Sequence, residues 1–250
     1  MTTPIPRFSN KVALVTGGSR GIGEAVVRRL AAEGAAVAFT YASSSDKALA
    51  LVSQIESDGG KALAIQADSA DVVAIERAVS TTVERFGALN ILVNNAGILQ
   101  LGSVDAFSLE DFDRMFAVNV RATFAAAKAC SPVMQAGDRI ISVGSVVAQR
   151  SGFPGSSVYS MTKSAIAGMI RGLAIDFAPR GITVNNVQPG PTSTDMNPAD
   201  APHAGMIKSL IPLGRVGTAD EVAGMVAYLA SEEAAFVTGA SLTIDGGYLA

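Results

Sequence analysis

The sequence predicts an α/β fold in which a doubly wound, seven-stranded parallel sheet carries helices on both faces. Two observations lead to this prediction. Short apolar runs alternate with longer segments of helical periodicity through all 250 residues, as in repeated strand–helix–strand units with right-handed crossovers. Most of these runs are continuously apolar, as expected of parallel strands covered on both faces. No linker or internal repeat interrupts the pattern, so we predict a single domain over residues 1–250.

Each element is predicted from its own segment. In order, the strands are predicted at KVALVT (11–16), AAVAFTY (35–41), KALAIQ (61–66), NILVNN (90–95), DRIISV (138–143), ITVNNVQ (182–188) and ASLTID (240–245). Helices are predicted near 21–33, 46–58, 71–86, 109–130, 156–178 and 219–230. Gly34 and Gly87 follow two of these helices as stops. Asp71 and Thr218 are predicted to cap the starts of two others.

The interval from Pro189 to Pro212 departs from this rhythm. It reads PGPTSTDMNPADAPHAGMIKSLIP, contains five prolines and shows little regular pattern before Met206. Loops this long inside a compact domain are usually lids or binding loops. This one follows the C-terminal end of a strand, where open α/β sheets bind ligands. We therefore predict a substrate-binding loop or lid at about 189–212.

Composition excludes several classes of site. The net charge is −3 and no basic run is present, which argues against nucleic-acid binding. One cysteine, Cys130, and one histidine, His203, cannot form a disulfide framework or a Cys/His metal cage, so we predict no metal site. Cys130 is expected to be buried as a small hydrophobe. His203 is expected to be a solvated loop residue, which argues against a Ser-His-Asp mechanism.

The predicted location follows from the N-terminal segment and the apolar runs. MTTPIPRFSN lacks the apolar core of a signal peptide, and no run approaches the roughly 18–20 residues of a spanning helix. We therefore expect a soluble, cytoplasmic protein that contacts neither membrane nor nucleic acid. Hydrophobic residues make up 49% of the chain, which leaves apolar surface beyond the needs of one core.

A glycine-rich segment, TGGSRGIG (16–23), directly follows the first predicted strand and opens the first helix. The predicted cofactor contacts in it are Gly17, Ser19, Arg20, Gly21, Ile22 and Gly23. Its glycines allow a tight turn and the close approach of a pyrophosphate to the helix N-terminus. This strand–turn–helix context favours dinucleotide binding over an ordinary glycine turn. No lysine follows Gly23, which disfavours a P-loop ATPase.

The end of the second predicted strand indicates which dinucleotide is preferred. It reads FTYASSSDK, and no carboxylate precedes Asp46, which is predicted to begin the next helix. An NAD site usually places Asp or Glu here to bind the adenosine ribose. Arg20 can instead pair with a 2′-phosphate, and Tyr41 and Ser43, which flank Ala42, can donate hydrogen bonds to it. We predict NADP(H) in preference to NAD(H); a solvated arginine beside a plain serine turn is the alternative.

Further motifs follow in order. NNAG (94–97) ends the fourth strand, Asn119 lies in FAVNVRATF, and Ser145 lies in ISVGSVV. Tyr159 and Lys163 in YSMTK stand one helical turn apart, so they share a helix face. With the glycine segment, these motifs resemble the short-chain dehydrogenase/reductase family, specifically its 3-oxoacyl-carrier-protein reductase and carbonyl reductase branch. The match runs from about Lys11 to Gly247.

This resemblance implies a Rossmann fold and assigns roles to particular residues. The implied catalytic tetrad is Asn119, Ser145, Tyr159 and Lys163. The implied cofactor contacts are Asp68 and Ser69 at the adenine, Asn95, Ala96 and Gly97 at the ribose, Lys163 beside Tyr159 at the nicotinamide ribose, and Pro189, Gly190, Thr192 and Thr194 at the nicotinamide amide.

The chemistry of the implied tetrad can be argued from its side chains. Hydride delivery to a carbonyl leaves an alkoxide, so a proton donor and an oxyanion partner must be in place. We expect the Lys163 ammonium to lower the pKa of Tyr159 from its ordinary ~10. Ser145 would donate to the substrate oxygen, and Asn119 would hold a water that connects Lys163 to solvent. Each assignment has a structural alternative. Tyr159 and Lys163 could be an ordinary helical pair, Ser145 could only cap a turn, and Asn119 could only satisfy buried backbone groups.

The helices predicted at 109–130 and 156–178 suggest partner copies of the chain. Both are rich in alanine, and the second is apolar on nearly every side, so they need more cover than one sheet face provides. We expect them to meet other subunits, and the resemblance implies a homotetramer. Burial within the chain's own core is the alternative.

The substrate is predicted only as a class. The candidate pocket residues are Leu99, Leu101, Val146, Phe153, Met196 and Met206. Such an apolar pocket suits a ketone or 3-oxoacyl group, and the predicted reaction is its reversible NADPH-dependent reduction. A rival prediction comes from FTYASS and VQPGPTSTDMNPAD, which are similar to a bacterial branch linked to cyclic di-GMP binding and biofilm dispersal. This similarity implies that the protein binds a nucleotide and has a regulatory role.

Overall fold

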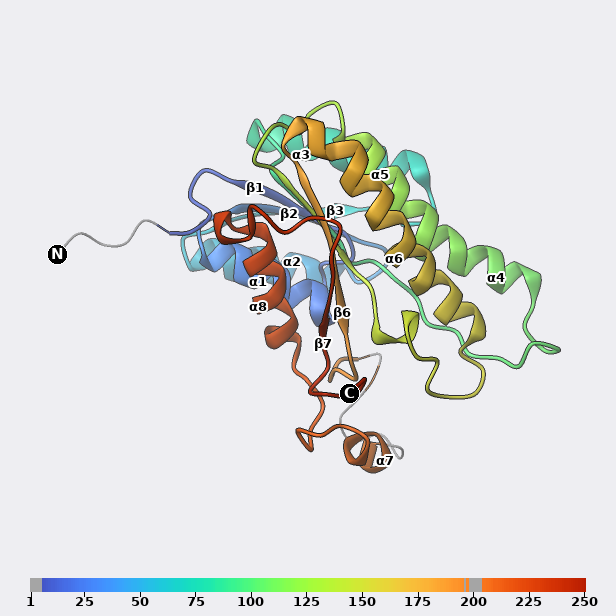
Figure 1. Ribbon diagram of the computed structural model, residues 1–250. Coiled ribbons are helices and arrows are strands. Elements are labelled where there is room, and N and C mark those ends of the chain that lie inside the picture. Colours follow the sequence, from blue (N-terminus) through green and yellow to red (C-terminus); the bar gives the residue numbers. More distant parts are fainter. Residues whose placement is uncertain (1–5, 196, 198–203) are drawn as a thin grey trace.

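The computed structural model, which describes residues 6–195, 197 and 204–250, contains one parallel sheet in the order β3-β2-β1-β4-β5-β6-β7 (Figure 1). The strands are β1 Val12–Val15, β2 Ala36–Tyr41, β3 Lys61–Gln66, β4 Ile91–Asn94, β5 Arg139–Val143, β6 Thr183–Pro189 and β7 Ser241–Ile244. All seven predicted strands are confirmed, with their ends within one residue or so of the expected positions.

Helices cover both faces of this sheet, as predicted. They are α1 Gly21–Ala32, α2 Ser45–Ser57, α3 Val72–Phe86, α4 Leu109–Phe116, α5 Ala122–Cys130, α6 Ser157–Phe177, α7 Ala204–Ser209 and α8 Ala219–Ala230. In Figure 1, α1, α2 and α8 lie on one face, and α3, α5 and α6 lie on the other. Alternate residues of each strand feed the two cores: Val15 packs under α1 and α8, whereas Leu14 packs under α3, α5 and α6. This two-sided burial explains the continuously apolar runs.

The order of the strands determines where a ligand-binding crevice can form. The chain builds outward from β1 to β3, then crosses back so that β4 pairs with the free edge of β1. The connections that leave β1 and β4 therefore run to opposite faces of the sheet. They separate at the C-terminal ends of these strands, which is the place where doubly wound sheets bind ligands.

Two predicted helix starts are confirmed by their caps. The Asp71 carboxylate accepts a hydrogen bond from the Val73 backbone N–H at 2.9 Å. Thr218 and Glu221 form a reciprocal capping box at the start of α8. Gly87, with φ of 81°, ends α3 as expected.

The prediction of a single regular helix over 109–130 was wrong in one respect. A π-helical turn, Ala117–Arg121, separates α4 from α5. Such a turn widens the helix by one residue and frequently occurs at functional sites. Here it carries the buried Asn119, whose backbone carbonyl accepts a hydrogen bond from the Thr123 hydroxyl. Residue-type periodicity could not reveal it, because the helical pattern continues on both sides.

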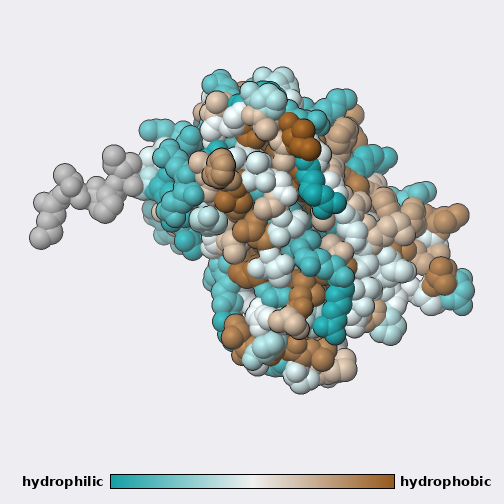
Figure 2. Space-filling model, in the orientation of Figure 1, coloured by the Kyte–Doolittle hydropathy of each residue, from teal (hydrophilic) through white to brown (hydrophobic). Residues whose placement is uncertain are grey.

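The interval predicted as a loop or lid contains a short helix, α7, which projects beyond the body of the domain (Figure 1). Figure 2 shows apolar surface at the α7 end of the domain. Met206 in α7 and Leu210 and Leu213 after it are exposed. His203 lies outside the described residues, so its predicted exposure is untested. Cys130 is buried as expected, and this burial raises the pKa of its thiol. None of the helices within the described ranges is long and apolar enough to cross a membrane.

Candidate active site

A crevice of about 370 Å³ opens where the chain leaves the C-terminal ends of β1, β2 and β4. It brings together most of the predicted cofactor contacts, namely Gly17, Ser19, Arg20, Gly21, Ile22, Gly23, Tyr41, Ala42, Ser43, Asp68, Ser69, Asn95, Ala96, Gly97, Tyr159, Lys163 and Thr194. Pro189, Gly190 and Thr192 are not among its lining residues. The sequence did not indicate several other lining residues: Thr40, Ser44, Ala67, Ile98, Arg114, Val118, Val143, Gly144 and Asp195.

The glycine loop forms the floor of this crevice and has no room for side chains. Gly17 has a φ of 66°, and a Cβ there would stand 3.0 Å from the Cα of Ala96. A Cβ on Gly23 would stand 2.2 Å from the carbonyl oxygen of Gly17. Only glycine allows this turn, which leaves the N-terminal N–H groups of α1 open to an anion.

Thr16 and Asn95 tie the glycine loop to the NNAG segment. The Thr16 hydroxyl accepts hydrogen bonds from the backbone N–H groups of Asn95 and Ala96, each at 3.0 Å. The Asn95 side-chain amide donates to the carbonyls of Thr16 and Gly17, also at 3.0 Å. The Asn95 side chain therefore acts on the loop, so this residue can pack against a ribose only through its backbone.

Arg20 and the end of β2 line the adenosine side of the crevice. Arg20 is exposed and forms no ion pair within the described part of the chain. Tyr41 is half-buried, and Ala42 and Ser43 are exposed beside it. No carboxylate occurs in this group, as the sequence predicted.

Asp68 has a partner that the sequence did not indicate. Its carboxylate accepts a hydrogen bond from the Ala70 backbone N–H at 2.9 Å and pairs with the Arg114 guanidinium at 3.0 Å. The Ala70 N–H and Arg114 together hold the pKa of Asp68 below its usual range. Arg114 comes from α4, 46 residues along the chain, so only the tertiary structure brings it here.

Tyr159 and Lys163 lie one turn apart on α6 and both face the crevice. The Lys163 Nζ stands 5.7 Å from the centroid of the Tyr159 ring and donates a hydrogen bond to the Val143 carbonyl at 3.0 Å. Burial lowers the pKa of Lys163 to about 8. The ammonium is desolvated by the walls of the crevice and held by a carbonyl, not by a carboxylate.

The expectation that Lys163 lowers the pKa of Tyr159 was wrong for this structure. Burial around the phenol raises the pKa of Tyr159 to about 12, and a hydrogen bond from Ser145 offsets only part of that rise. Desolvation penalises the phenolate, and the Lys163 ammonium is held at the Val143 carbonyl. The sequence could place the two side chains on one helix face but could not report their burial.

Ser145 is positioned by α6. It caps a short 3₁₀ turn, Val146–Ala148, and its hydroxyl accepts a hydrogen bond from the Val147 backbone N–H at 3.3 Å. The Ser164 hydroxyl of α6 donates to the Ala148 carbonyl at 3.0 Å, and Ser160 similarly holds Val147. Ser145 therefore caps a turn and also lies beside Tyr159. The turn-capping role and the proposed role as a donor in the active site are compatible.

Asn119 is completely buried behind the crevice, and its amide is fully used. Its Oδ1 accepts a hydrogen bond from the Ile98 backbone N–H at 2.9 Å, and its Nδ2 donates to the Ile98 carbonyl at 3.0 Å and to the Thr162 hydroxyl at 3.1 Å. The Thr162 hydroxyl in turn donates to the Tyr159 carbonyl. The predicted role of holding a water stays a prediction. These bonds connect the segment after NNAG to the turn of α6 that carries Tyr159.

The predicted substrate-pocket residues do not gather in the crevice. Leu101, Phe153 and Met206 are exposed, and Leu99 is partly buried. Val146 is buried against Ile211 and Tyr248 in a separate small cluster, and its predicted place in a substrate pocket stays a prediction. Met196 lies outside the described residues. No group of three or more metal-ligating side chains occurs in the ranges that the structure describes.

The chain is similar to known proteins over nearly its whole length. A family model described as enoyl-(acyl carrier protein) reductase covers residues 17–249. A short chain dehydrogenase from Burkholderia cenocepacia J2315, solved in complex with NADP, is 51% identical with a TM-score of 0.96, and the match covers 98% of this chain and all of that one. The chain belongs to the short-chain dehydrogenase/reductase (SDR) family.

Two curated relatives show how widely the functions of SDR proteins differ at similar identity. The cyclic-di-GMP-binding biofilm dispersal mediator protein of Escherichia coli K12 is 48% identical over 241 residues, which cover 96% of this chain and 98% of the relative. The 3-oxoacyl-[acyl-carrier-protein] reductase of Synechocystis is 41% identical over 240 residues, covering 95% and 96%. Family membership therefore establishes the class of oxidoreductase fold but does not select a substrate.

Proposed function

We propose that this SDR protein uses NADP(H) to reduce a ketone or 3-oxoacyl carbonyl to an alcohol, reversibly, with Tyr159 as the general acid. One observation carries the proposal. Tyr159 and Lys163 face the same crevice whose floor is the glycine loop, and Ser145 lies close enough to Tyr159 to influence the pKa of its phenol. A reacting carbonyl and a dinucleotide would therefore meet beside a proton donor and a hydroxyl donor.

The residues present fit a dinucleotide. At Gly17 and Gly23 the loop is packed so tightly that a Cβ would collide with Ala96 or with the Gly17 carbonyl, and the N-terminus of α1 offers free N–H groups to a pyrophosphate. Arg20 and the serines after β2 are placed for a 2′-phosphate, and the segment from Tyr41 to Ser45 carries no carboxylate. When bound, the nicotinamide would supply the hydride to the carbonyl carbon.

The chain's own groups would handle the oxygen of the substrate. The Ser145 hydroxyl would donate a hydrogen bond to the developing alkoxide, and Tyr159 would transfer its phenol proton to it. With a pKa of about 12, Tyr159 is fully protonated at neutral pH, as a proton donor must be. Lys163, with a pKa of about 8, remains mostly charged at pH 7 and can hold the nicotinamide ribose and favour the transient phenolate.

The direct test is an assay of NADPH oxidation at 340 nm against a panel of ketones and 3-oxoesters. We expect at least one member of the panel to support continuous turnover, with NADPH used faster than NADH. Tight NADPH binding with no turnover on any carbonyl would contradict the reductase proposal.

The Arg20→Ala variant tests the assignment of the 2′-phosphate. Loss of one charge-assisted contact should weaken NADPH binding by roughly 10- to 100-fold, because hydrogen bonds to charged groups contribute about 1.5–3 kcal/mol. NADH binding should change by less than twofold. Dissociation constants for both cofactors, measured by fluorescence titration, give the comparison. Equal weakening of both would place Arg20 at the pyrophosphate instead.

A second candidate function is binding of cyclic di-GMP with a regulatory role. It is favoured by the 48% identity to the E. coli protein, which is described as cyclic-di-GMP-binding. The two functions can be separated by titrating cyclic di-GMP into the protein with and without NADPH. Competition would place the cyclic dinucleotide in the crevice.

We also propose that the protein assembles as a homotetramer through α4, α5 and α6. Phe124 on α5 is 51% exposed, and it borders a shallow hollow lined by Phe116 and Val120. Leu109 on α4 and Ile175 on α6 are exposed as well. Apolar faces of this kind normally mark contact surfaces. Light scattering in solution would measure the mass of the assembly.

A further inference from the structure

We propose that the ion pair between Lys47 and Asp195 is a latch that holds the turn after β6 over the cofactor crevice and sets the rate of cofactor exchange. This inference rests on the proposed binding of NADP(H). Lys47 lies in the first turns of α2, and Asp195 follows β6 across the crevice, 148 residues away. Their Nζ and Oδ2 atoms stand 3.1 Å apart.

The base of the loop that carries Asp195 is firmly held. The Gly217 backbone N–H donates to the Pro191 carbonyl, and the Ser193 N–H donates to the Gly217 carbonyl, each at 2.9 Å. The outgoing and returning chains are therefore bonded to each other where the loop leaves and rejoins the domain.

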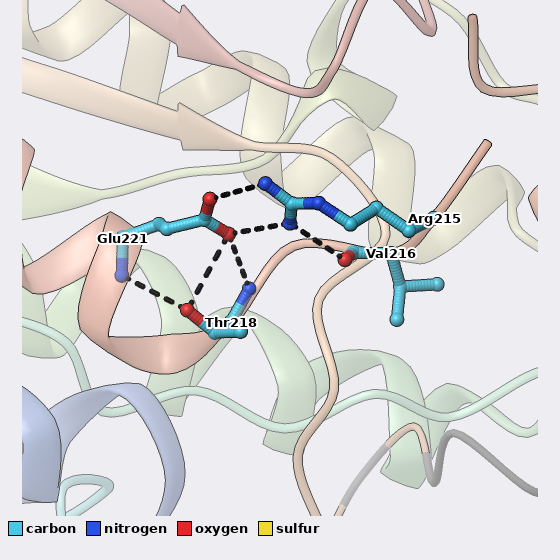
Figure 3. Close-up of polar contacts among 4 residues, drawn as sticks. All are labelled: Arg215, Val216, Thr218 and Glu221. Carbon is cyan, nitrogen blue, oxygen red and sulfur yellow. Dashed lines mark hydrogen bonds and ion pairs between the residues drawn. The ribbon is translucent and has the colours of Figure 1, made fainter. Parts of the chain in front are cut away.

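The returning chain is also anchored to the start of α8, as Figure 3 shows. Arg215 pairs with both carboxylate oxygens of Glu221, at 2.6 and 2.9 Å. One of these oxygens also accepts the Thr218 backbone N–H at 2.8 Å. This network holds the pKa of Glu221 down at about 2, first through Arg215 and then through the Thr218 N–H. The Arg215–Glu221 ion pair therefore stays charged throughout the neutral pH range, and the returning end of the loop stays bonded to α8.

The segment that carries Asp195 is a compact turn. Thr194 and Asn197 exchange backbone hydrogen bonds of 3.2 and 3.0 Å, and the Asn197 side chain donates to the Thr192 carbonyl at 3.2 Å. The bond to Thr192 ties Asn197 to the bonded base, because Thr192 is bridged to Gly217. The ion pair with Lys47 is therefore an attachment of Asp195 additional to this base.

This turn lies where a pyrophosphate would have to enter. Thr194 and Asp195 line the crevice, and a Cβ on Gly21 would stand 3.6 Å from the Thr194 side chain. Within the described residues, the ion pair with Lys47 is the polar side-chain contact that joins the turn to α2. The pair therefore joins one lining residue of the crevice, Asp195, to the start of α2 beside Ser43 and Ser44, which also line it.

The ion pair between Lys47 and Asp195 is weak enough to open and close rapidly. Both side chains are more than half exposed, at 60% for Lys47 and 55% for Asp195. Exposed pairs are weak and are screened by salt, so the latch can open thermally on every exchange. Its loss should change rates by roughly two- to fivefold, the range expected for such a pair.

Stopped-flow fluorescence of NADPH with the full-length protein tests the latch. Lys47→Gln and Asp195→Asn should each raise the association and the dissociation rate constants by roughly two- to fivefold. The equilibrium constant should change by less than twofold, because the latch opposes entry and exit alike. The charge-swapped Lys47→Asp/Asp195→Lys protein should recover the slow wild-type rates. Lys61→Gln, at the N-terminal end of β3 and outside the lining of the crevice, is the matched control with unchanged rates.

Two results would overturn the latch. Unchanged exchange rates in both single variants would show that the pair does not limit exchange. Opposite effects, with Lys47→Gln weakening and Asp195→Asn tightening NADPH but not NADH, would make Lys47 a 2′-phosphate ligand. Failure of the proposed NADP(H) binding looks different: the wild-type protein would then bind no NADPH in the same experiment. Failure of the proposed reduction alone would appear as NADPH binding without turnover, which leaves the exchange rates measurable.

Discussion

Tyr159→Phe is expected to lower the rate of carbonyl reduction by roughly 10²- to 10⁴-fold, the usual contribution of a positioned general acid. The substitution removes only the phenol oxygen that would protonate the alkoxide. The ring that lines the crevice remains, so the affinity for NADPH should stay within about twofold of wild type. Single-turnover oxidation of bound NADPH by a ketone, followed at 340 nm, measures the chemical step directly.

The matched control for this variant is Tyr228→Phe, which removes a phenol oxygen from α8 on the other side of the sheet. It should leave turnover unchanged. Retention of most of the rate by Tyr159→Phe would assign the proton donor to another group, with the Ser145 hydroxyl as the nearest candidate.

Lys163→Met should stabilise the cofactor-free protein while it slows turnover by more than tenfold. The pKa of Lys163 is lowered from 10.5 to about 8, so keeping the folded side chain charged at pH 7 costs roughly 3 kcal/mol. Methionine fills similar space without a charge, although the hydrogen bond to the Val143 carbonyl is lost. We expect a net gain of roughly 1–2 kcal/mol in the free energy of unfolding, or several degrees in Tm.

The pH dependence of that gain has a definite sign. Between pH 8 and 10.5 the unfolded chain still carries the Lys163 proton, whereas the folded chain loses it. The stability of the wild-type protein therefore rises with pH in this window, and its deficit relative to Lys163→Met shrinks. Urea denaturation of both proteins at pH 7, 8 and 9.5 measures the difference. A deficit that stays constant with pH would mean that the ammonium is not desolvated.

Lys61→Met is the corresponding stability control, because Lys61 is exposed at the start of β3. It should shift the free energy of unfolding by less than about 0.5 kcal/mol, as expected of surface substitutions. A buried lysine that lowers stability while serving the proposed reaction would show the usual cost of a catalytic site.

The fold was accessible from the sequence because its signals are local. Parallel strands that are buried on both faces read as apolar runs, and the seven runs became β1 to β7. The glycine loop could also be predicted from the sequence, because its constraint is local: a Cβ at Gly23 would collide with the Gly17 carbonyl of the same loop. The four-residue spacing of Tyr159 and Lys163 correctly placed them on one face of α6. The π-helical turn at Asn119 escaped notice because it leaves the surrounding periodicity intact.

The sequence by itself determined the class of fold, the glycine loop and the residue types available for proton transfer. Only the tertiary structure decided how those groups behave: the raised pKa of Tyr159, the pairing of Asp68 with Arg114 and the contact of Lys47 with Asp195. Backbone sterics and periodicity are properties of neighbouring residues. Desolvation and ion pairing depend instead on which distant segments the sheet order brings together, and no local pattern records that.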